Sequence, residues 1–208
     1  MLVDLHVHEC TFSKDSKNSL EEIVESAKRK GLDGVCITDH DSMGLKETAE
    51  KYSKEVNFPI FVGVEVLTNQ GDILAFGIDR IPDKKLDAQQ FIDYVKELNG
   101  VCFSAHPFRN NNRGLEENLL SVNGLDGIEV LNGNTDLQAN KKALEYCKIL
   151  GLQAIGASDS HSEKTLGKYA TKLPKWANNL GEFIDVLKLG QCKPAVLEHS
   201  GYRILEQF

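Results

Sequence analysis

Asp4-Leu5-His6-Val7-His8 is the stretch on which the interpretation of this sequence is built. Residues 2–7 are typical of a short strand, and side chains alternate along a strand, so His6 and His8 are expected on the same side of the backbone. Two imidazoles two residues apart on one rigid element can hold a single metal ion. Taken alone, the motif would be interpreted as a pair of surface histidines.

The other histidines strengthen the metal interpretation. The chain has six, at positions 6, 8, 40, 106, 161 and 199. His40 and His161 each lie within two residues of an aspartate, and His106 follows a β-like run without an acid. His199 has neither setting, and we expect it at the surface.

Length and composition indicate a single domain, residues 1–208, large enough to bury a core without disulfides. No apolar run approaches the roughly 20 residues needed to cross a bilayer, and no signal sequence is visible, which predicts a cytoplasmic protein. The five cysteines are widely spaced and odd in number, which favours reduced thiols. Cys36, Cys102 and Cys147 are expected in the core, and Cys10 is interpreted as buried filler or a soft metal ligand.

The net charge of −7 argues against binding an extended nucleic-acid backbone, because that needs clustered Lys and Arg. A small phosphorylated ligand remains compatible with this charge if metal ions make the site locally positive. The sequence gives no indication of the oligomeric state.

Apolar strands alternate with amphipathic helices along the whole chain, which predicts an α/β fold with a parallel sheet, either open or closed into a barrel. Ser19 and Glu22 form a capping box for the first helix. The expected strands are 2–7, 34–38, 59–66, 72–78, 101–105, 127–131, 153–157, 169–172 and 195–197. The expected helices are 20–30, 44–52, 87–98, 116–120, 136–150 and 180–189.

The positions of the polar residues favour a barrel. Seven candidate ligands fall at or just after the carboxyl ends of predicted strands: His6, His8, His40, Glu65, His106, Asp159 and His161. A βα barrel gathers all these ends on one face, whereas an open doubly wound sheet would scatter several of them. We therefore expect a metal site at the carboxyl face of a barrel, with seven strands as one option.

Five motifs in order give the chain a family resemblance: Asp4 to His8, Ile37-Thr-Asp-His40, Gly63-Val-Glu65, Ala105-His-Pro107 and Ser158-Asp-Ser-His161. Together they resemble the PHP (polymerase and histidinol phosphatase) family over essentially the whole chain. The resemblance implies a distorted, TIM-like (β/α)7 barrel, a trinuclear metal centre and hydrolysis of phosphate esters. It also implies a stand-alone metal-dependent phosphoesterase.

The resemblance also implies how the ligands group. His6, His8, Glu65 and Asp159 would hold one ion, and Glu65 would bridge to a second ion that is also held by His106. A third ion would be held by Asp15, His40 and His161. We expect two or three divalent ions, and such mixed ligands suit zinc, manganese or iron.

Asp72 departs from the family pattern, which often has a histidine at this position. A carboxylate can also hold such metals, so we predict Asp72 as a further ligand. The alternative is a second ion that binds weakly or not at all.

Other residues are assigned roles around the ions. Glu65 and Asp159 are expected to act in catalysis, and Arg109 is expected to grip the phosphate because a guanidinium makes a two-point contact with phosphate oxygens. Arg113 is a second candidate, but we interpret it as a solvated loop residue. The carboxylates expected to orient the imidazoles are Asp4, Asp39, Asp41 and Glu129.

The predicted function is hydrolysis of a small phosphate ester, a phosphorylated metabolite or nucleotide, by metal-activated water. One alternative is an amidohydrolase-type metal hydrolase, which also opens with His-x-His but uses a bridging lysine. The other is a non-catalytic PHP module with a structural metal.

Overall fold

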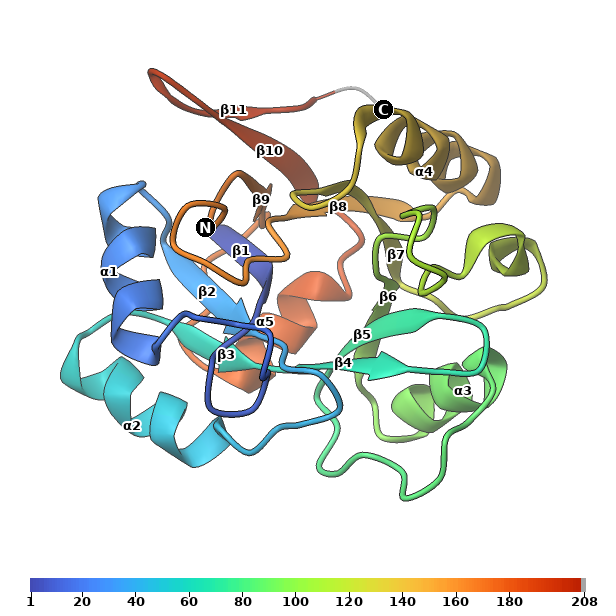
Figure 1. Ribbon diagram of the computed structural model, residues 1–208, viewed down its shortest axis with the longest axis horizontal. Helices are drawn as coiled ribbons and strands as arrows, with labels where there is room; N and C mark the ends of the chain where they lie inside the picture. Colours follow the sequence, from blue (N-terminus) through green and yellow to red (C-terminus); the bar gives the residue numbers. More distant parts are fainter. Residues whose placement is uncertain (207–208) are drawn as a thin grey trace.

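The computed structural model of the protein describes residues 1–206 and has an α/β architecture, with helices placed around two sheets (Figure 1). The strands are β1 Leu2–Val7, β2 Gly34–Ile37, β3 Ile60–Val62, β4 Val64–Leu67, β5 Asp72–Phe76, β6 Val101–Ser104, β7 Gly127–Asn132, β8 Gln153–Ala157, β9 Tyr169–Lys172, β10 Lys193–Glu198 and β11 Gly201–Ile204. The helices are α1 Leu20–Arg29, α2 Lys46–Glu55, α3 Ala88–Glu97, α4 Leu137–Leu150 and α5 Leu180–Leu187, with a 3-10 turn η1 at Glu116–Leu120.

Helix boundaries follow local signals in the sequence. The Ser19 side chain accepts a hydrogen bond from the Glu22 amide, and the Glu22 side chain accepts one from the Ser19 amide, so the predicted capping box is confirmed. Helix α4 ends at Gly151, whose φ of 63° lies in the left-handed region that glycine adopts without strain. The predicted start and end of these two helices agree with the structure to within a residue.

The strands form two sheets. One has the order β11-β10-β9-β1-β2-β3 and the other β4-β5-β6-β7-β8. The predicted strand 59–66 is therefore wrong as a single element, because it divides at Gly63 between the two sheets. A Cβ at Gly63 would lie 2.6 Å from the Ala75 carbonyl oxygen, so only glycine fits at this division.

The prediction of a parallel sheet holds for β1, β2 and β3 and for β6, β7 and β8. It is wrong for β5, which runs antiparallel to both β4 and β6. The short turn 68–71 joins β4 to β5 without a helix, and a connection of that length permits only antiparallel pairing. Strands β9, β10 and β11 also pair antiparallel, and β11 is not among the predicted strands.

The two sheets meet at two seams. Val7, at the end of β1, forms an isolated bridge with Ser160, which follows β8. His40, which follows β2, forms another with Glu65 on β4. Both seams therefore join candidate ligand segments from different sheets.

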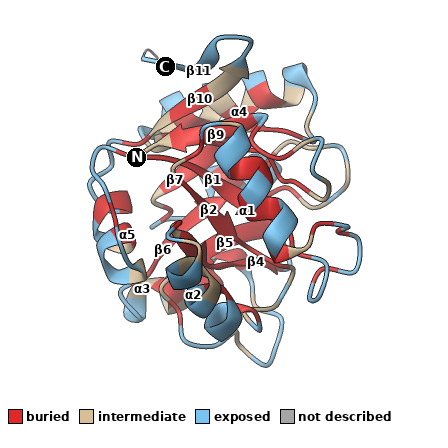
Figure 2. Ribbon diagram, turned by 90° about the vertical axis from the view of Figure 1, so that its left-hand side faces the viewer, coloured by how far each residue is buried: buried red, intermediate tan, exposed pale blue. Residues whose placement is uncertain are grey.

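An aromatic cluster packs between residues of the two sheets and α5. Phe61 of β3 stacks on Phe183 of α5 with 4.2 Å between ring centroids, and Phe76 of β5 contacts Phe183 edge-on. Strands β1 to β9 are mostly buried, whereas the β10–β11 hairpin is partly exposed and the helices expose their outer faces (Figure 2). Cys36, Cys102 and Cys147 are buried in the hydrophobic core, as predicted. Because the strands pack tightly on both sides, their carboxyl ends hold side chains in fixed positions.

Candidate metal centre

His6 on β1 and His8 directly after it lie side by side, both fully buried, with 5.0 Å between their ring centroids. Their Nε2 atoms lie 3.4 and 3.5 Å from Glu65 Oε2. The same two atoms lie 3.6 and 3.3 Å from Asp159 Oδ1. Four residues from β1, β4 and the segment after β8 thus converge, as the alternation along β1 predicts.

Glu65 is the carboxylate that all these side chains share. Its Oε1 lies 2.8 Å from His106 Nε2, and its Oε2 lies 2.8 Å from His40 Nδ1. Its side chain is 1% exposed, so these imidazoles surround it in place of water. A carboxylate with one oxygen toward each of two imidazole groups has the geometry of a bridge between two metal positions.

Asp15, His40 and His161 form a more open group at the rim. Asp15 Oδ2 lies 3.3 Å from His40 Nε2 and 3.3 Å from His161 Nε2. His8 stacks near His161 with 4.2 Å between ring centroids, which joins this group to the buried one.

The structure therefore brings all nine predicted metal residues together, in three neighbouring groups of which two share Glu65. We call these groups position 1 (His6, His8, Glu65, Asp159), position 2 (Glu65, Asp72, His106) and position 3 (Asp15, His40, His161).

Asp72 is the first residue of β5 and is fully buried. Its Oδ2 lies 3.7 Å from His106 Nε2 and accepts a hydrogen bond from Arg113 Nε at 2.6 Å. Its Oδ1 accepts a second one from Arg113 Nη2 at 2.9 Å. Arg113 is thus an ion-pair partner, and its interpretation as a solvated loop residue is wrong.

Unpartnered polar atoms test whether these residues fit metal ions. Within residues 1–206, His6 Nε2, His8 Nε2 and Glu65 Oε2 are buried without a hydrogen-bond partner. Burying such atoms without a partner costs about 1–3 kcal/mol each. The three atoms face one another at 3.4 and 3.5 Å, and nitrogen and oxygen donors of this kind are those that zinc, manganese and iron accept. The donor set fits more than one divalent ion.

The charges of the group support this fit. Burial opposes the charged form of His6, but the nearby Asp159, Glu65 and Glu129 carboxylates raise its pKa well above its usual value. Burial also opposes ionisation of Glu65, yet His6 and the other imidazoles hold the pKa of Glu65 well below its usual value. The metal-free site therefore keeps a proton among its imidazoles, which a divalent cation would replace.

His8 behaves differently from His6. Burial lowers the pKa of His8 to about 4. Its imidazole is therefore neutral near pH 7 and ready to donate a lone pair.

Two hydrogen-bonded chains orient the buried imidazoles. His6 Nδ1 lies 3.2 Å from Glu129 Oε1, and Glu129 Oε2 accepts a hydrogen bond from the His106 amide at 2.7 Å. His8 Nδ1 lies 3.2 Å from Ser13 Oγ, which donates to Asp39 Oδ1 at 2.8 Å. Such partners fix the ring orientation and the tautomer.

These chains confirm the contact predicted for Glu129, and Asp39 reaches His8 only through Ser13. The prediction is wrong for Asp4 and Asp41. Asp4 instead accepts hydrogen bonds from the Ser158 and Gly167 amides at 2.9 Å, and Asp41 accepts one from the Leu67 amide at 3.3 Å.

Arg109 donates from Nη1 to Asp159 Oδ2 at 2.7 Å. Asn132 Nδ2 donates to the same oxygen at 3.2 Å, which leaves Oδ1 of Asp159 facing the imidazoles. Sequence reasoning missed Asn132 and Ser13, although Asn132 ends a strand on the site face.

Asp159 has φ of 51° and His106 has φ of 27°, so both adopt a backbone conformation that is rare for non-glycine residues.

The site opens through a small polar cavity of about 90 Å³. Its lining combines rim residues of positions 1 to 3 with three residues of one loop, Arg109, Asn111 and Arg113.

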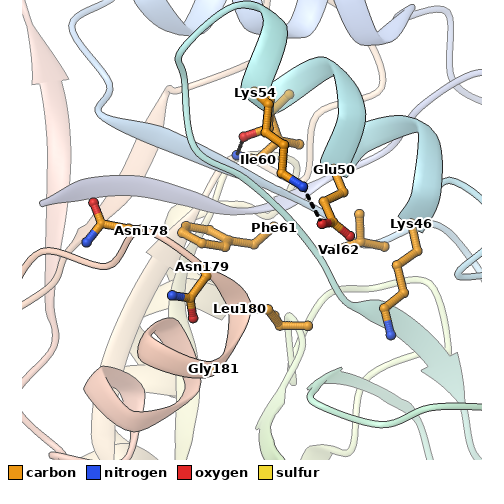
Figure 3. A pocket seen from close by; sticks show the side chains of 11 residues that line it. Lys46, Glu50, Lys54, Ile60, Phe61, Val62, Asn178, Asn179, Leu180 and Gly181 are labelled. Atoms are coloured by element: carbon orange, nitrogen blue, oxygen red, sulfur yellow. Dashed lines mark hydrogen bonds and ion pairs between the residues drawn. The ribbon is translucent and has the colours of Figure 1, made fainter.

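A larger cavity, about 380 Å³, lies elsewhere, between α2, β3 and the start of α5 (Figure 3). Its lining contains no histidine, and its acid, Glu50, is paired with Lys54 at 2.7 Å. It lacks the chemistry of the polar site.

Two other sequence expectations have clear outcomes. His199 is exposed and outside the site, as expected. Cys10 is exposed, so the interpretation as buried filler is wrong, and it is not part of any of the candidate metal groups within residues 1–206.

Comparison with known proteins decides the family. The sequence profile of the PHP domain matches residues 4–131, which carry four of the five motifs. The chain belongs to the PHP family. A second profile, described as PHP-associated, matches residues 138–192. The PHP resemblance of the motifs is therefore confirmed.

Curated relatives share part of this PHP chain. An uncharacterized protein of Methanocaldococcus jannaschii is 30% identical over 142 residues, which cover 64% of this chain and 82% of that protein. A protein of Thermotoga maritima described as "Probable histidinol-phosphatase" is 28% identical over 110 residues, 46% of this chain and 47% of that protein.

Solved structures share the fold of this PHP chain. A two-domain protein of Bacteroides vulgatus, described as containing a "predicted PHP-like metal-dependent phosphoesterase", has a TM-score of 0.72 at 20% identity, covering 93% of this chain and 64% of that one. An amidohydrolase from Chromobacterium violaceum with bound sulfate has a TM-score of 0.65 at 17% identity, covering 89% and 96%. A lesion-specific endonuclease of Pyrococcus furiosus has a TM-score of 0.65 at 17% identity, covering 98% and 57%.

One feature bears on membrane association. Within residues 1–206, no helix is both long and apolar enough to cross a membrane.

Proposed function

We propose that this PHP protein is a metal-dependent phosphoesterase that hydrolyses a small phosphate ester. The observation that carries the proposal is the buried Glu65 carboxylate, whose Oε2 faces His6 Nε2 and His8 Nε2, with none of these three atoms hydrogen-bonded among the described residues. Relatives described as "Probable histidinol-phosphatase" and "Probable phosphatase" support the same class of reaction.

Positions 1, 2 and 3 are the residues that would hold two or three divalent ions. When bound at such sites, divalent ions supply Lewis-acid charge and a water of lowered pKa for an in-line displacement at phosphorus. Glu65 and Asp159 hold the imidazoles at fixed distances, and Glu129 and Ser13 fix the ring orientations. The protein therefore contributes a rigid donor set that needs little rearrangement.

Arg109 is proposed to bind the phosphate group. One of its nitrogens is fixed on Asp159 Oδ2, and its side chain is 29% exposed and lines the polar cavity. A guanidinium anchored in this way presents its remaining N–H groups to phosphate oxygens with little loss of conformational freedom.

A small substrate suits the site. The cavity of about 90 Å³ has room for one phosphate group and little more, so the rest of the ester would extend toward solvent. The chain carries a net charge of −7, which disfavours long polyanions.

We propose that the two sheets act together as one distorted, TIM-like (β/α)7 barrel. The bridges Val7–Ser160 and His40–Glu65 join their strand ends around the metal positions, and α5 packs into the interior against Phe61. This arrangement supports a shared carboxyl face.

The amidohydrolase alternative is less well supported. Among the residues described as lining the polar cavity there is no lysine, and Glu65 occupies the bridging position. Two arginines line the same cavity, which favours an anionic substrate group.

The test is a turnover assay on purified protein loaded with Mn²⁺ or Zn²⁺. A panel of phosphomonoesters and nucleotides is expected to give at least one substrate that a Glu65→Gln variant does not hydrolyse. Parallel reactions contain cyclic amides and single-stranded oligonucleotides. Turnover of amides alone, or of no compound with any metal, would overturn the proposal, and turnover of internal phosphodiesters would overturn the small-substrate part.

A further inference from the structure

The Asp72 carboxylate already forms an ion pair with a cationic side chain of the protein, the guanidinium of Arg113. Arg113 donates to both of its oxygens, Nε to Oδ2 at 2.6 Å and Nη2 to Oδ1 at 2.9 Å. The backbones are also joined, because the Asp72 amide donates to the Arg113 carbonyl oxygen at 2.7 Å. This bidentate ion pair satisfies the charge of a fully buried acid.

The other two buried carboxylates of the centre are arranged differently. Glu65 Oε2 accepts no hydrogen bond of good geometry among the described residues, and it faces ring nitrogens of His6, His8 and His40. Asp159 Oδ2 accepts a hydrogen bond from Arg109, and Asp159 Oδ1 faces the imidazoles. Each therefore keeps one oxygen for a metal ion, whereas Asp72 has a guanidinium nitrogen on both.

A divalent ion at position 2 would meet this guanidinium directly. The Asp72 oxygen nearest His106 Nε2, at 3.7 Å, is the same Oδ2 that binds Arg113 Nε. Two cations a few Å apart repel each other strongly where water is excluded. Binding at position 2 therefore requires the ion either to displace Arg113 or to tolerate its charge.

Displacement is sterically feasible. The Arg113 side chain is 34% exposed, while that of Asp72 is 0% exposed. Arg113 also lines the polar cavity, so its guanidinium can leave the carboxylate and remain in that cavity.

We propose that Arg113 is a built-in competitor for the divalent ion at position 2. This position consequently binds its ion more weakly than positions 1 and 3 and exchanges it readily. Arg113 thereby sets how many ions the centre holds at a given metal concentration. The inference rests on the proposed function, because it presupposes the metal centre.

Metal binding, without any substrate, tests the competition. Metal-free protein is titrated with Mn²⁺, and the free ion is followed by electron paramagnetic resonance. The wild type is expected to show two tight ions and one weaker ion. Arg113→Met, which removes the charge but keeps a long side chain, should tighten the weakest ion by roughly tenfold or more.

Three further variants locate the effect. Asp72→Asn should abolish the weakest binding event, because position 2 then lacks its carboxylate. The double variant Asp72→His with Arg113→Met avoids an unpaired buried carboxylate and should also bind the last ion tightly. Arg203→Met is the matched control, since Arg203 pairs with Glu198 at 2.6 Å on the exposed β10–β11 hairpin, and its isotherm should equal that of the wild type.

Equal affinities for all ions in the wild type would overturn the inference. So would unchanged binding of the last ion in both variants that lack Arg113, or weak binding that survives Asp72→Asn. These results leave the proposed function intact as long as tight ions are present. Absence of any bound Mn²⁺ in the wild type would overturn both.

Discussion

Glu65 Oε1 lies 2.8 Å from His106 Nε2, although the two residues are 41 positions apart, Glu65 on β4 and His106 in the loop after β6. The other oxygen of Glu65 faces His6 and His8 at 3.4 and 3.5 Å. One carboxylate thus connects the two halves of the buried donor set. This connection is the structural basis for placing more than one ion in the centre.

Replacing Glu65 should therefore remove metal and activity together. In Glu65→Gln, one anionic oxygen is lost and the amide places an N–H group against the imidazoles. We expect kcat/KM to fall by roughly 100-fold or more, since even residues behind the ligands change affinity or activity by 10–100-fold. Metal content by mass spectrometry should fall in the same protein, and unchanged metal content would contradict the bridging assignment.

Arg109 should affect substrate binding without affecting metal content. Its guanidinium has one nitrogen on Asp159 and others available to a phosphate. Loss of a charge-assisted hydrogen bond costs about 1.5–3 kcal/mol, so kcat/KM of Arg109→Met should fall by roughly 10–100-fold. Arg109→Lys should recover only part of this loss, because an ammonium group cannot make the two-point contact. Wild-type kinetics in Arg109→Met would remove Arg109 from the phosphate site.

Ser13 should control metal affinity through His8. Its hydroxyl lies between His8 Nδ1 and Asp39, so Ser13 is the link through which Asp39 orients the His8 ring. Ser13→Ala is expected to weaken metal binding by roughly 10–100-fold. Ser53→Ala is the control, because Ser53 lies on α2, donates to the Phe58 carbonyl oxygen and contacts none of the candidate ligands. Equal metal affinity in the two variants would contradict the orienting role.

Asp4 should make the stability of the metal-free protein depend on pH. Burial raises the pKa of Asp4 to about 6, against hydrogen bonds from Ser158 and Gly167 that lower it. The folded state therefore binds a proton that the unfolded state has released, and the stability from this group is present below about pH 4 and lost as the pH rises through about 6. A shift of this size corresponds to about 3 kcal/mol.

The measurement is the free energy of unfolding in urea, for wild type and Asp4→Asn, between pH 4 and pH 7.5. The variant cannot titrate at this position, so its stability relative to the wild type should rise with pH across this range. Parallel pH curves for the two proteins would show that Asp4 has an ordinary pKa.

The residues of the candidate site were predicted from the sequence more accurately than the directions and boundaries of the strands. His6, His40, His106 and Asp159 follow or end apolar strands, and strand packing brings such ends together whatever the exact topology. The composition of residues 72–78 does not indicate the direction of β5, because apolar content is the same in parallel and antiparallel strands. The signal in the sequence is the short turn 68–71, which permits only antiparallel pairing with β4. The division at Gly63 depends on the close approach of Ala75, which is a tertiary contact.

The contacts of Ser13, Asn132 and Arg113 were not predicted, because they too depend on tertiary structure. Ser13 and Asn132 are common polar residues, and their role depends on partners 26 and 27 positions away. Arg113 pairs with Asp72 across 41 positions. No local pattern distinguishes such residues from solvated loop residues, whereas paired histidines on a strand are distinctive by themselves.

The most direct test of the metal centre is a crystal structure of Mn²⁺-loaded protein with anomalous diffraction recorded at the manganese edge. The proposed function predicts at least two anomalous peaks, one between His6, His8 and Asp159 and all within coordination distance of residues of positions 1 to 3. Peaks located only elsewhere, or no peak beside Glu65, would contradict it.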